Sequence, residues 1–289
     1  MKKMFCLSLC IIVCFTACER VVDIDLNVAS PALVVEGRVI KDSLALVELR
    51  KTSSYFRPDI QQCVCNAIVV IEEDVFGPDT LEQIAPGKYR SAAMRGREGS
   101  DYHLKVFYDD QVYESYSHLS SEPRIYSLTP QAFSSFGNFG DSSDFNPGGG
   151  GETFLDSLPF FLFTNIYEDP DTTNYYMFRY CVNGEMQTGR YNVTADDNAE
   201  NDTLKYSPGP TALFFPGDTV SVRAYSIDEG LYSYFDMLND ALSSNSFFAS
   251  TPYNPVSNIS GGALGYFAAM SFDCDTIIIS LPPDIPGND

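Results

Sequence analysis

The stretch DYHLKVFYDDQVYESYS, residues 101–117, decides the fold of this chain. Its halves, 101–108 and 111–117, are short runs rich in aromatic and branched residues on either side of Asp109-Asp110, a pattern typical of a β-hairpin. Similar strand candidates precede it, separated by turn residues such as Gly77-Pro78 and Pro86-Gly87, at residues 33–39, 44–50, 67–72 and 88–91. Closely spaced strands of this kind predict an antiparallel β-sandwich of immunoglobulin or transthyretin type over residues 31–122.

The second half continues the β pattern. Strands are predicted at residues 160–166, 174–182, 219–225, 264–272 and 276–281. One helix is predicted between these strands, because Ser226-Ile227-Asp228-Glu229 resembles a capping box, which marks the start of a helix. An apolar stripe with helical spacing follows at Leu231, Phe235, Leu238 and Leu242. We therefore expect a mainly β protein in which a second antiparallel β domain with one amphipathic helix occupies residues 123–281, before a tail at 282–289.

Residues 131–152 have few aliphatic side chains, and Gly148 to Gly151 form an unbroken glycine run. Such a composition cannot offset the entropy of ordering, so we predict a flexible loop. The loop lacks the Gly-Lys-Ser/Thr that a phosphate-binding loop requires. Aromatic side chains in this loop and in a second one are candidate partner contacts, unless they fold back onto their own domain: Tyr55, Phe56, Phe133, Phe136, Phe139 and Phe145.

The N-terminus predicts export and lipidation. Lys2 and Lys3 precede an apolar run at residues 4–15, which is too short to span a bilayer as a helix. Phe15-Thr16-Ala17-Cys18 resembles a lipobox, so residues 1–17 are expected to be a signal peptide and Cys18 the acylated residue. Residues 18–30 would then be a tether. The alternative is an ordinary signal peptide followed by an incidental cysteine.

The formal net charge of −21 excludes most nucleic-acid binders, because phosphate backbones repel so acidic a chain. Four cysteines lie beyond Cys18 in the exported part: Cys63, Cys65, Cys181 and Cys274. An exported protein permits disulfides, and Cys181–Cys274 is a possible pair, with buried thiols as the alternative. Zinc prefers four Cys or His ligands, and the only two histidines, His103 and His118, each lie inside a β pattern, so we expect neither a metal site nor a cofactor.

No sequence motif indicates catalysis. The chain has neither a Gly-x-Ser-x-Gly elbow nor a His-Glu-x-x-His helix. The densest acidic cluster, residues 168–171, is explained by turn chemistry better than by calcium binding. We therefore expect a protein that is not an enzyme.

Several segments together resemble a family of Bacteroidota outer-membrane lipoproteins that is known only as a domain of unknown function. The most specific is NISGGALGYF, residues 258–267, and the others are residues 18–25, 33–37, 52–56, 66–69, 86–89, 175–179 and 225–228. Members are often encoded beside TonB-dependent receptors. The resemblance implies a lipid-anchored protein on the outer face of the outer membrane, acting as a partner of a TonB-dependent barrel in substrate capture. A structural or adhesion module of the envelope is the alternative.

Overall fold

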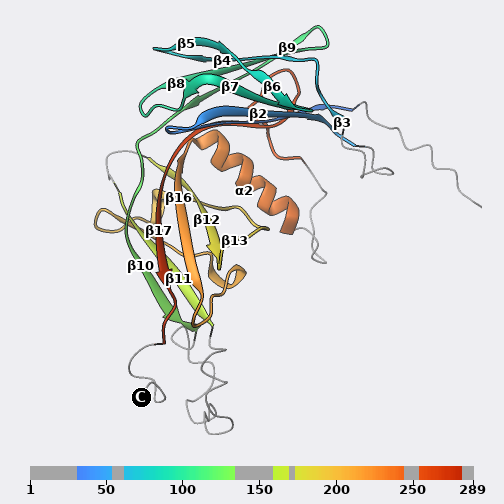
Figure 1. Cartoon of the computed structure of the whole chain (residues 1–289). Helices are drawn as coiled ribbons and strands as arrows, with labels where there is room; N and C mark the ends of the chain where they lie inside the picture. The colour runs from blue at the N-terminus through green and yellow to red at the C-terminus, as the bar shows by residue number, and fades with distance from the viewer. Residues whose placement is uncertain (1–30, 54–61, 134–158, 169–172, 244–253, 282–289) are drawn as a thin grey trace, which may run out of the picture. The chain divides into compact units, whose positions relative to one another are not determined.

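The structure of the protein, a computed structural model, describes residues 31–53, 62–133, 159–168, 173–243 and 254–281. Within these residues the protein is mainly β, with three sheets and one α-helix (Figure 1). The predicted fold class is therefore confirmed at the level of β-sandwich architecture with a single helix. Cys18, the tether and the signal peptide lie outside the described residues.

The largest sheet has ten strands, in the order β13-β12-β16-β17-β1-β2-β7-β6, with β14 paired to β12 and β3 to β2. Its strands are Glu185–Met186 (β13), Tyr175–Val182 (β12), Thr219–Ile227 (β16), Leu264–Ile278 (β17), Leu33–Ile40 (β1), Leu44–Lys51 (β2), Lys88–Arg95 (β7), Glu82–Ala85 (β6), Asn192–Ala195 (β14) and Gln62–Cys63 (β3).

Two smaller sheets accompany it. The first has the order β5-β4-β8-β9 and the second the order β10-β11-β15. Their strands are Gly77–Thr80 (β5), Ile68–Glu73 (β4), Asp101–Tyr108 (β8), Gln111–His118 (β9), Arg124–Ala132 (β10), Phe160–Tyr167 (β11) and Thr203–Tyr206 (β15). The predicted hairpin is present as β8 and β9, which turn at Asp109 and Asp110, both with positive φ. Short 3₁₀ turns lie at Asp196–Asn198 and Gly209–Thr211.

Strand β17 joins the two halves of the large sheet. Its first part, from Leu264 to Met270, pairs in parallel with β1, and its second part, from Ser271 to Ile278, pairs antiparallel with β16. Figure 1 shows this strand curving continuously between the two regions. The sequence predicted two closing strands here, and that expectation is wrong: one strand of 15 residues replaces them.

The large sheet packs both smaller sheets against the same side. Along β17, Phe267 and Ala269 belong to the core cluster shared with the four-stranded sheet, whereas Tyr266 and Met270 point to the opposite side. A second cluster places Phe178 and Tyr180 of β12 against Leu162 of β11. The predicted boundary at residue 122 falls between β9 and β10, and the division into two domains stays a prediction.

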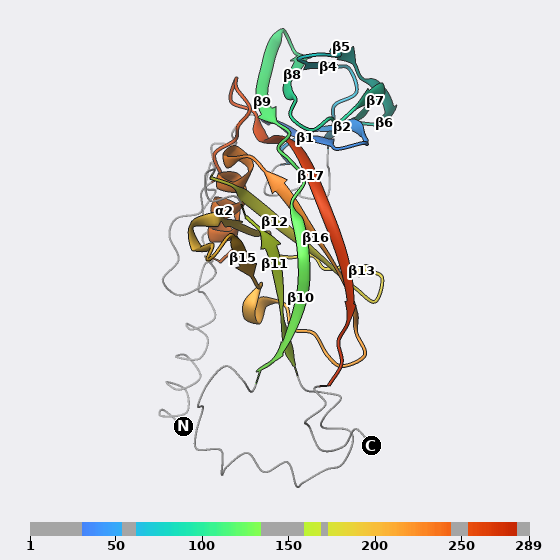
Figure 2. The ribbon, with the colours of Figure 1, turned by 90° about the vertical axis from the view of Figure 1, so that its left-hand side faces the viewer.

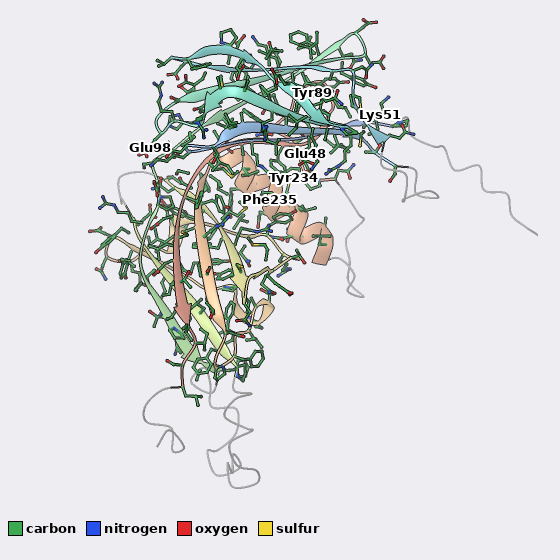
Figure 3. All side chains as sticks on the ribbon, viewed as in Figure 1. Glu48, Lys51, Tyr89, Glu98, Tyr234 and Phe235 are labelled. Carbon is green, nitrogen blue, oxygen red and sulfur yellow. The ribbon has the colours of Figure 1, made fainter. Side chains whose placement is uncertain are left out.

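Helix α2, Glu229–Ser243, covers the other side of the large sheet. Leu231 and Phe235 are buried against it, Leu238 is partly buried, and Leu242 at the end of the predicted stripe is 55% exposed. Tyr234 and Phe235 lie between the helix and the strands (Figure 3). No helix in the described part of the chain is long and apolar enough to cross a membrane.

The helix begins differently from the sequence prediction. Ser226 was expected to be the N-cap, but it lies in β16 opposite Ser271. Asp228 caps the helix instead, because its Oδ1 accepts a hydrogen bond of 2.7 Å from the Leu231 amide. The pattern Ser-x-x-Glu therefore located the helix but placed its first residue two positions too early.

Candidate functional site

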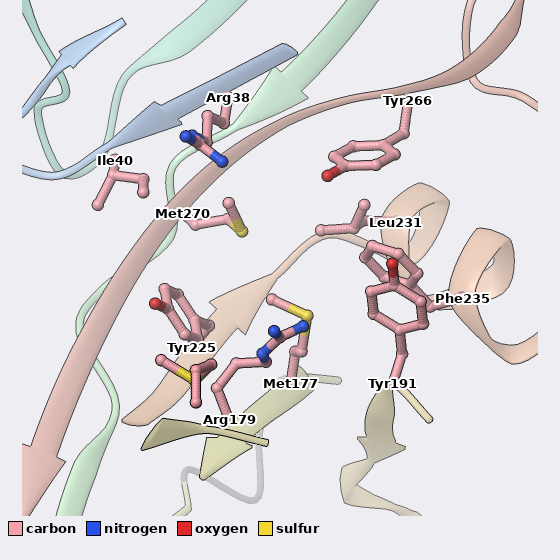
Figure 4. A pocket seen from close by; sticks show the side chains of 11 residues that line it. Arg38, Ile40, Met177, Arg179, Tyr191, Tyr225, Leu231, Phe235, Tyr266 and Met270 are labelled. Atoms are coloured by element: carbon pink, nitrogen blue, oxygen red, sulfur yellow. The ribbon is translucent and has the colours of Figure 1, made fainter. Parts of the chain in front are cut away.

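A pocket of about 220 Å³ lies between helix α2 and the side of the large sheet that faces away from the two smaller sheets (Figure 4). Strands β1, β12, β13, β16 and β17 contribute to it, together with the segment before β14. Its lining residues are Arg38, Ile40, Met177, Arg179, Met186, Tyr191, Tyr225, Leu231, Phe235, Tyr266 and Met270. Arg38 is exposed and Met186 is 41% exposed, so solvent reaches the pocket.

The two-residue period of β-strands brings these side chains together. Met177 and Arg179 alternate along β12 with core residues that face the three-stranded sheet. On β1, Arg38 and Ile40 alternate in the same way with Val39, which is fully buried in the first core cluster. In the paired register, Arg38 is opposite Ala268, and Ile40 is opposite Met270. The apolar alternation that builds the two cores therefore leaves a second, mixed set of side chains facing α2.

Aromatic rings form one wall of the pocket. Tyr191 and Phe235 stack with centroids 4.0 Å apart and planes 16° apart, and Phe235 contacts Tyr266 at 5.2 Å. Asn239 of α2 fixes the backbone of Tyr191: its Oδ1 accepts from the Tyr191 amide at 3.0 Å, and its Nδ2 donates to the Tyr191 carbonyl at 2.6 Å. Helix and strand side chains thus hold this wall from both sides.

The hydroxyls of Tyr266 and Tyr234 stay neutral. Burial, with a smaller contribution from the negative charge of Glu36, raises the pKa of Tyr266 far above its ordinary value. The same two causes raise the pKa of the neighbouring Tyr234. These hydroxyls can therefore donate or accept hydrogen bonds, but they carry no charge at physiological pH.

Two arginines bring positive charge to the pocket. Glu36, two residues before Arg38 on the same side of β1, forms its ion pair with Arg50. Arg38 itself has no carboxylate within ion-pair distance among the described residues. The Arg179 guanidinium lies over the Tyr191 ring, 5.8 Å from its centroid, in a cation–π arrangement. Figure 4 shows Arg38 and Arg179 entering the pocket from different edges.

A third arginine lies directly beside the pocket. Arg223 of β16 is opposite Arg179 in the β12–β16 register, so both side chains lie on the same side of the sheet. Its guanidinium is 5.5 Å from the Phe272 ring centroid. Like charges directly opposite each other in neighbouring strands destabilise a sheet. This arrangement concentrates positive charge in a chain whose formal net charge is −21.

The sequence is matched over most of its length by one protein family, described as Domain of unknown function (DUF4249), at residues 19–274. The chain belongs to the DUF4249 family. No curated protein matches the sequence. This match supports the predicted resemblance to a family of unknown function. The family description assigns no function, so the role of the pocket in this DUF4249 protein is inferred from the chemistry of its lining residues.

The lining of the pocket offers binding chemistry rather than acid–base chemistry. None of its described side chains is a carboxylate, imidazole, thiol or aliphatic hydroxyl. Arginine only donates hydrogen bonds, and the remaining lining side chains are thioethers, aliphatic groups and aromatic rings. The pocket can therefore hold an anionic group and an apolar body together.

The groups best suited to proton transfer lie elsewhere. His118 Nδ1 is 2.7 Å from Asp101 Oδ1, and His103 lies between Glu72 and Glu114 at 3.5 and 3.3 Å. Among the described residues, no group of three potential metal ligands comes together. These pairs lie on the four-stranded sheet and contribute no side chain to the pocket under α2.

A second hollow, of about 630 Å³, lies beside β11. Glu168 lines it and is only 7% exposed. Its Oε1 accepts a hydrogen bond from the Asn174 side chain at 2.5 Å. Burial, and then the Glu168 carboxylate, raise the pKa of the adjacent Tyr176 far above its ordinary value. The hollow is polar and carries charges of both signs, because Arg124 also lines it.

Of the aromatic residues predicted as partner contacts, the structure describes Phe133, which does not line the pocket. Phe133 is 43% exposed and contacts Phe161 with centroids 5.4 Å apart, away from α2. Gln131 and Ala132 belong to β10, so the predicted loop at 131–152 begins too early. The other predicted aromatics lie outside the described residues: Tyr55, Phe56, Phe136, Phe139 and Phe145.

The possible disulfide is not formed in the structure. Cys181 on β12 and Cys274 on β17 are free thiols, and strand β16 lies between their strands. Cys181 is opposite Ser221, whereas Cys274 is opposite Arg223, so the two cysteines are not neighbours in the sheet. The sequence spacing could not show this because it carries no information on strand order. Cys63 and Cys65 are also free, and both are exposed.

Sequence reasoning missed the two arginines. Each interrupts an otherwise apolar or aromatic strand: Arg38 follows Gly37, and Arg179 follows the run Tyr175-Tyr176-Met177-Phe178. The sequence did contain a signal: in each strand one cation lies on the side opposite the core residues. This signal marks each arginine as a candidate, but it cannot show that Arg38 and Arg179 line the same pocket, because their strands are about 140 residues apart in sequence.

Proposed function

We propose that this DUF4249 protein is a non-enzymatic binding protein on the cell surface, which captures a small ligand for a TonB-dependent transporter. The observation that carries the proposal is the pocket under α2. Its lining combines two cations with apolar and aromatic side chains, and none of the described side chains in it forms an acid–base pair. Few, well-placed polar groups in a mainly apolar hollow are typical of small-molecule binding sites.

The proposed location rests on the N-terminus and on the family resemblance. Residues 15–18 resemble a lipobox, and acidic residues follow Cys18. The protein would be anchored by acylated Cys18 in the outer membrane and would face the cell exterior. Cys18→Ala should abolish labelling with a radioactive fatty acid and release the protein from the membrane fraction. Cys14→Ala is the control and should leave both unchanged; continued labelling of Cys18→Ala would contradict the anchor.

The proposed partner can be identified by cross-linking in intact cells. Tagged protein is purified from outer membranes after cross-linking, and the captured partners are identified by mass spectrometry. Recovery of one dominant TonB-dependent barrel supports the transport role, and the cargo of that barrel would then define the nutrient. The Cys18→Ala variant is the control for contacts formed only after cell lysis.

A structural or adhesion module is the second candidate, because one exposed row of apolar side chains favours a protein contact. Ile68, Phe107 and Val112 are directly opposite one another across β4, β8 and β9, and they are 58%, 40% and 46% exposed. Recovery of the protein alone, or with unrelated envelope proteins, would contradict the transport role and favour this second candidate.

A further inference from the structure

We propose that the pocket under α2 selects a small organic anion with an aromatic or otherwise apolar body, and that Arg38 and Arg179, which enter the pocket from different edges, supply the positive charge that favours the anion. This inference rests on the proposed binding function and names the class of ligand. It follows from the charge, the hydrogen-bonding capacity and the size of the pocket.

The charge of the pocket favours an anion. Arg38 and Arg179 line it, no carboxylate lines it among the described residues, and the nearest acidic neighbour of Arg38 on β1, Glu36, is paired with Arg50. Arg179 also faces Arg223 directly across the strand pair. A bound anion would offset this like-charge repulsion, whereas a bound cation would add to it.

The hydrogen-bonding capacity favours an anion over a neutral polyol. A sugar hydroxyl group both donates and accepts, so its recognition uses acceptors as well as donors. Among the described lining side chains, the tyrosine hydroxyls can accept, but the two guanidinium groups only donate, and none is an amide or a carboxylate. A carboxylate or sulfonate, which only accepts, matches this set.

The apolar part of the pocket requires an apolar body on the ligand. Met177, Met186 and Met270 adapt their shape readily, because thioether side chains are flexible and polarisable. Phe235 and Tyr266 add ring surface at 5.2 Å from each other. The volume of about 220 Å³ lies below the roughly 300 Å³ at which pockets for drug-sized molecules begin. The pocket thus fits one small ring system rather than an oligosaccharide or a long peptide.

The test compares two fluorescent probes of nearly the same shape, 2-naphthoate and 2-naphthamide, with acetate as an anion that lacks the ring. Binding to the full purified protein is measured by titration calorimetry and by probe fluorescence. We expect 2-naphthoate to bind at least about tenfold more tightly than 2-naphthamide, because its charged group gains charge-assisted hydrogen bonds. Acetate is expected to bind too weakly to compete.

The variants Arg38→Gln and Arg179→Gln remove one charge each from the pocket. Each should weaken 2-naphthoate binding about tenfold and leave 2-naphthamide binding within about twofold. Arg124→Gln is the matched control, because it removes the same charge from the other hollow and should change neither affinity. Arg179→Lys keeps the charge but loses the planar fork, so it should restore part of the selectivity. Circular dichroism verifies that each variant is folded.

Equal binding of the two probes, failure of both to bind, or wild-type selectivity in the arginine variants would overturn the inference. This binding test and the cross-linking test of the proposed function can fail independently of each other. A barrel recovered by cross-linking, without selectivity for 2-naphthoate, would reject the ligand class and retain the transport role. Arginine-dependent selectivity without a barrel would retain the ligand class and reject that role.

Discussion

The carboxylate of Asp228 connects helix α2 with strands β9 and β17, and its removal tests how the helix is attached to these strands. Its Oδ1 accepts from the Leu231 amide at 2.7 Å and caps helix α2, while the Ser117 hydroxyl of β9 donates to its Oδ2. Ser117 Oγ in turn accepts from the Ala269 amide of β17 at 2.8 Å. Asp228→Ala breaks this connection at its centre and leaves the Ser117 hydroxyl without its acceptor.

The expected cost follows from these contacts. Loss of an N-cap costs about 1 kcal/mol, and a buried hydroxyl whose donated hydrogen bond is lost adds about 1–3 kcal/mol. Part of this is offset because burial disfavours the ionised carboxylate, as the raised pKa of Asp228 shows. We therefore expect Asp228→Ala to lower the free energy of unfolding by about 2 kcal/mol.

Urea unfolding followed by circular dichroism measures this change. With a slope of about 3 kcal/mol per molar, a loss of that size lowers the midpoint by roughly 0.7 M. Asp236→Ala is the control, because Asp236 lies on the exposed side of the same helix, and its replacement should stay within about 0.5 kcal/mol of wild type. Equal midpoints for Asp228→Ala and Asp236→Ala would refute the assignment of Asp228 as the cap and connector.

Two further predictions concern the same region. Gly265→Ala should destabilise the protein severely in thermal unfolding, because a Cβ there would lie 2.0 Å from the Val35 carbonyl oxygen, whereas Gly262→Ala, with similar positive φ but open space, should cost only about 1 kcal/mol. Replacing Asp228 by Asn should remove part of the pH dependence of stability. Burial raises the pKa of Asp228 in the folded state, so the folded protein binds more protons than the unfolded chain, and its stability falls as the pH rises from about 4 through the folded pKa. An unchanged pH slope in urea unfolding of Asp228→Asn would contradict this assignment.

The strands that face a core were predictable from the sequence, because burial on one side imposes alternation. Strands β1, β2, β8 and β9 were located to within a residue or two, since apolar and polar side chains alternate along them. Strand β10 was missed, because partly buried and exposed residues alternate along it with little apolar contrast. The short strands β3 and β13 carry two residues each, too few for any period to be visible.

The errors at α2 and β17 have a common physical origin. A local pattern such as Ser226-x-x-Glu229 indicates only which structure a short segment favours in isolation. In the folded protein, strand pairing overrides this preference: β16 extends through Ser226 to Ile227, because β12 and β17 continue alongside it. In the same way, Asp273 and Asp275 suggest a break in the chain, yet β17 continues through them because its hydrogen bonds to β16 are satisfied there. Both corrections lengthen a strand at the expense of a predicted turn or cap.

The same continuity explains why the pocket exists and why it was not predictable. Because β17 pairs with β1 and then with β16, it brings Arg38 of β1 and Arg179 of β12 to one side of one sheet. Each arginine alone is an exposed or half-buried cation on a strand, which is ordinary. The two arginines line one pocket only because both of their strands belong to the sheet that β17 completes. Helix α2, which Asp228 caps, covers this pocket. A change that weakens the β1–β17 pairing should therefore impair ligand selectivity and the stability of the first core together, because Val39 of β1 and Phe267 of β17 are buried in that same core.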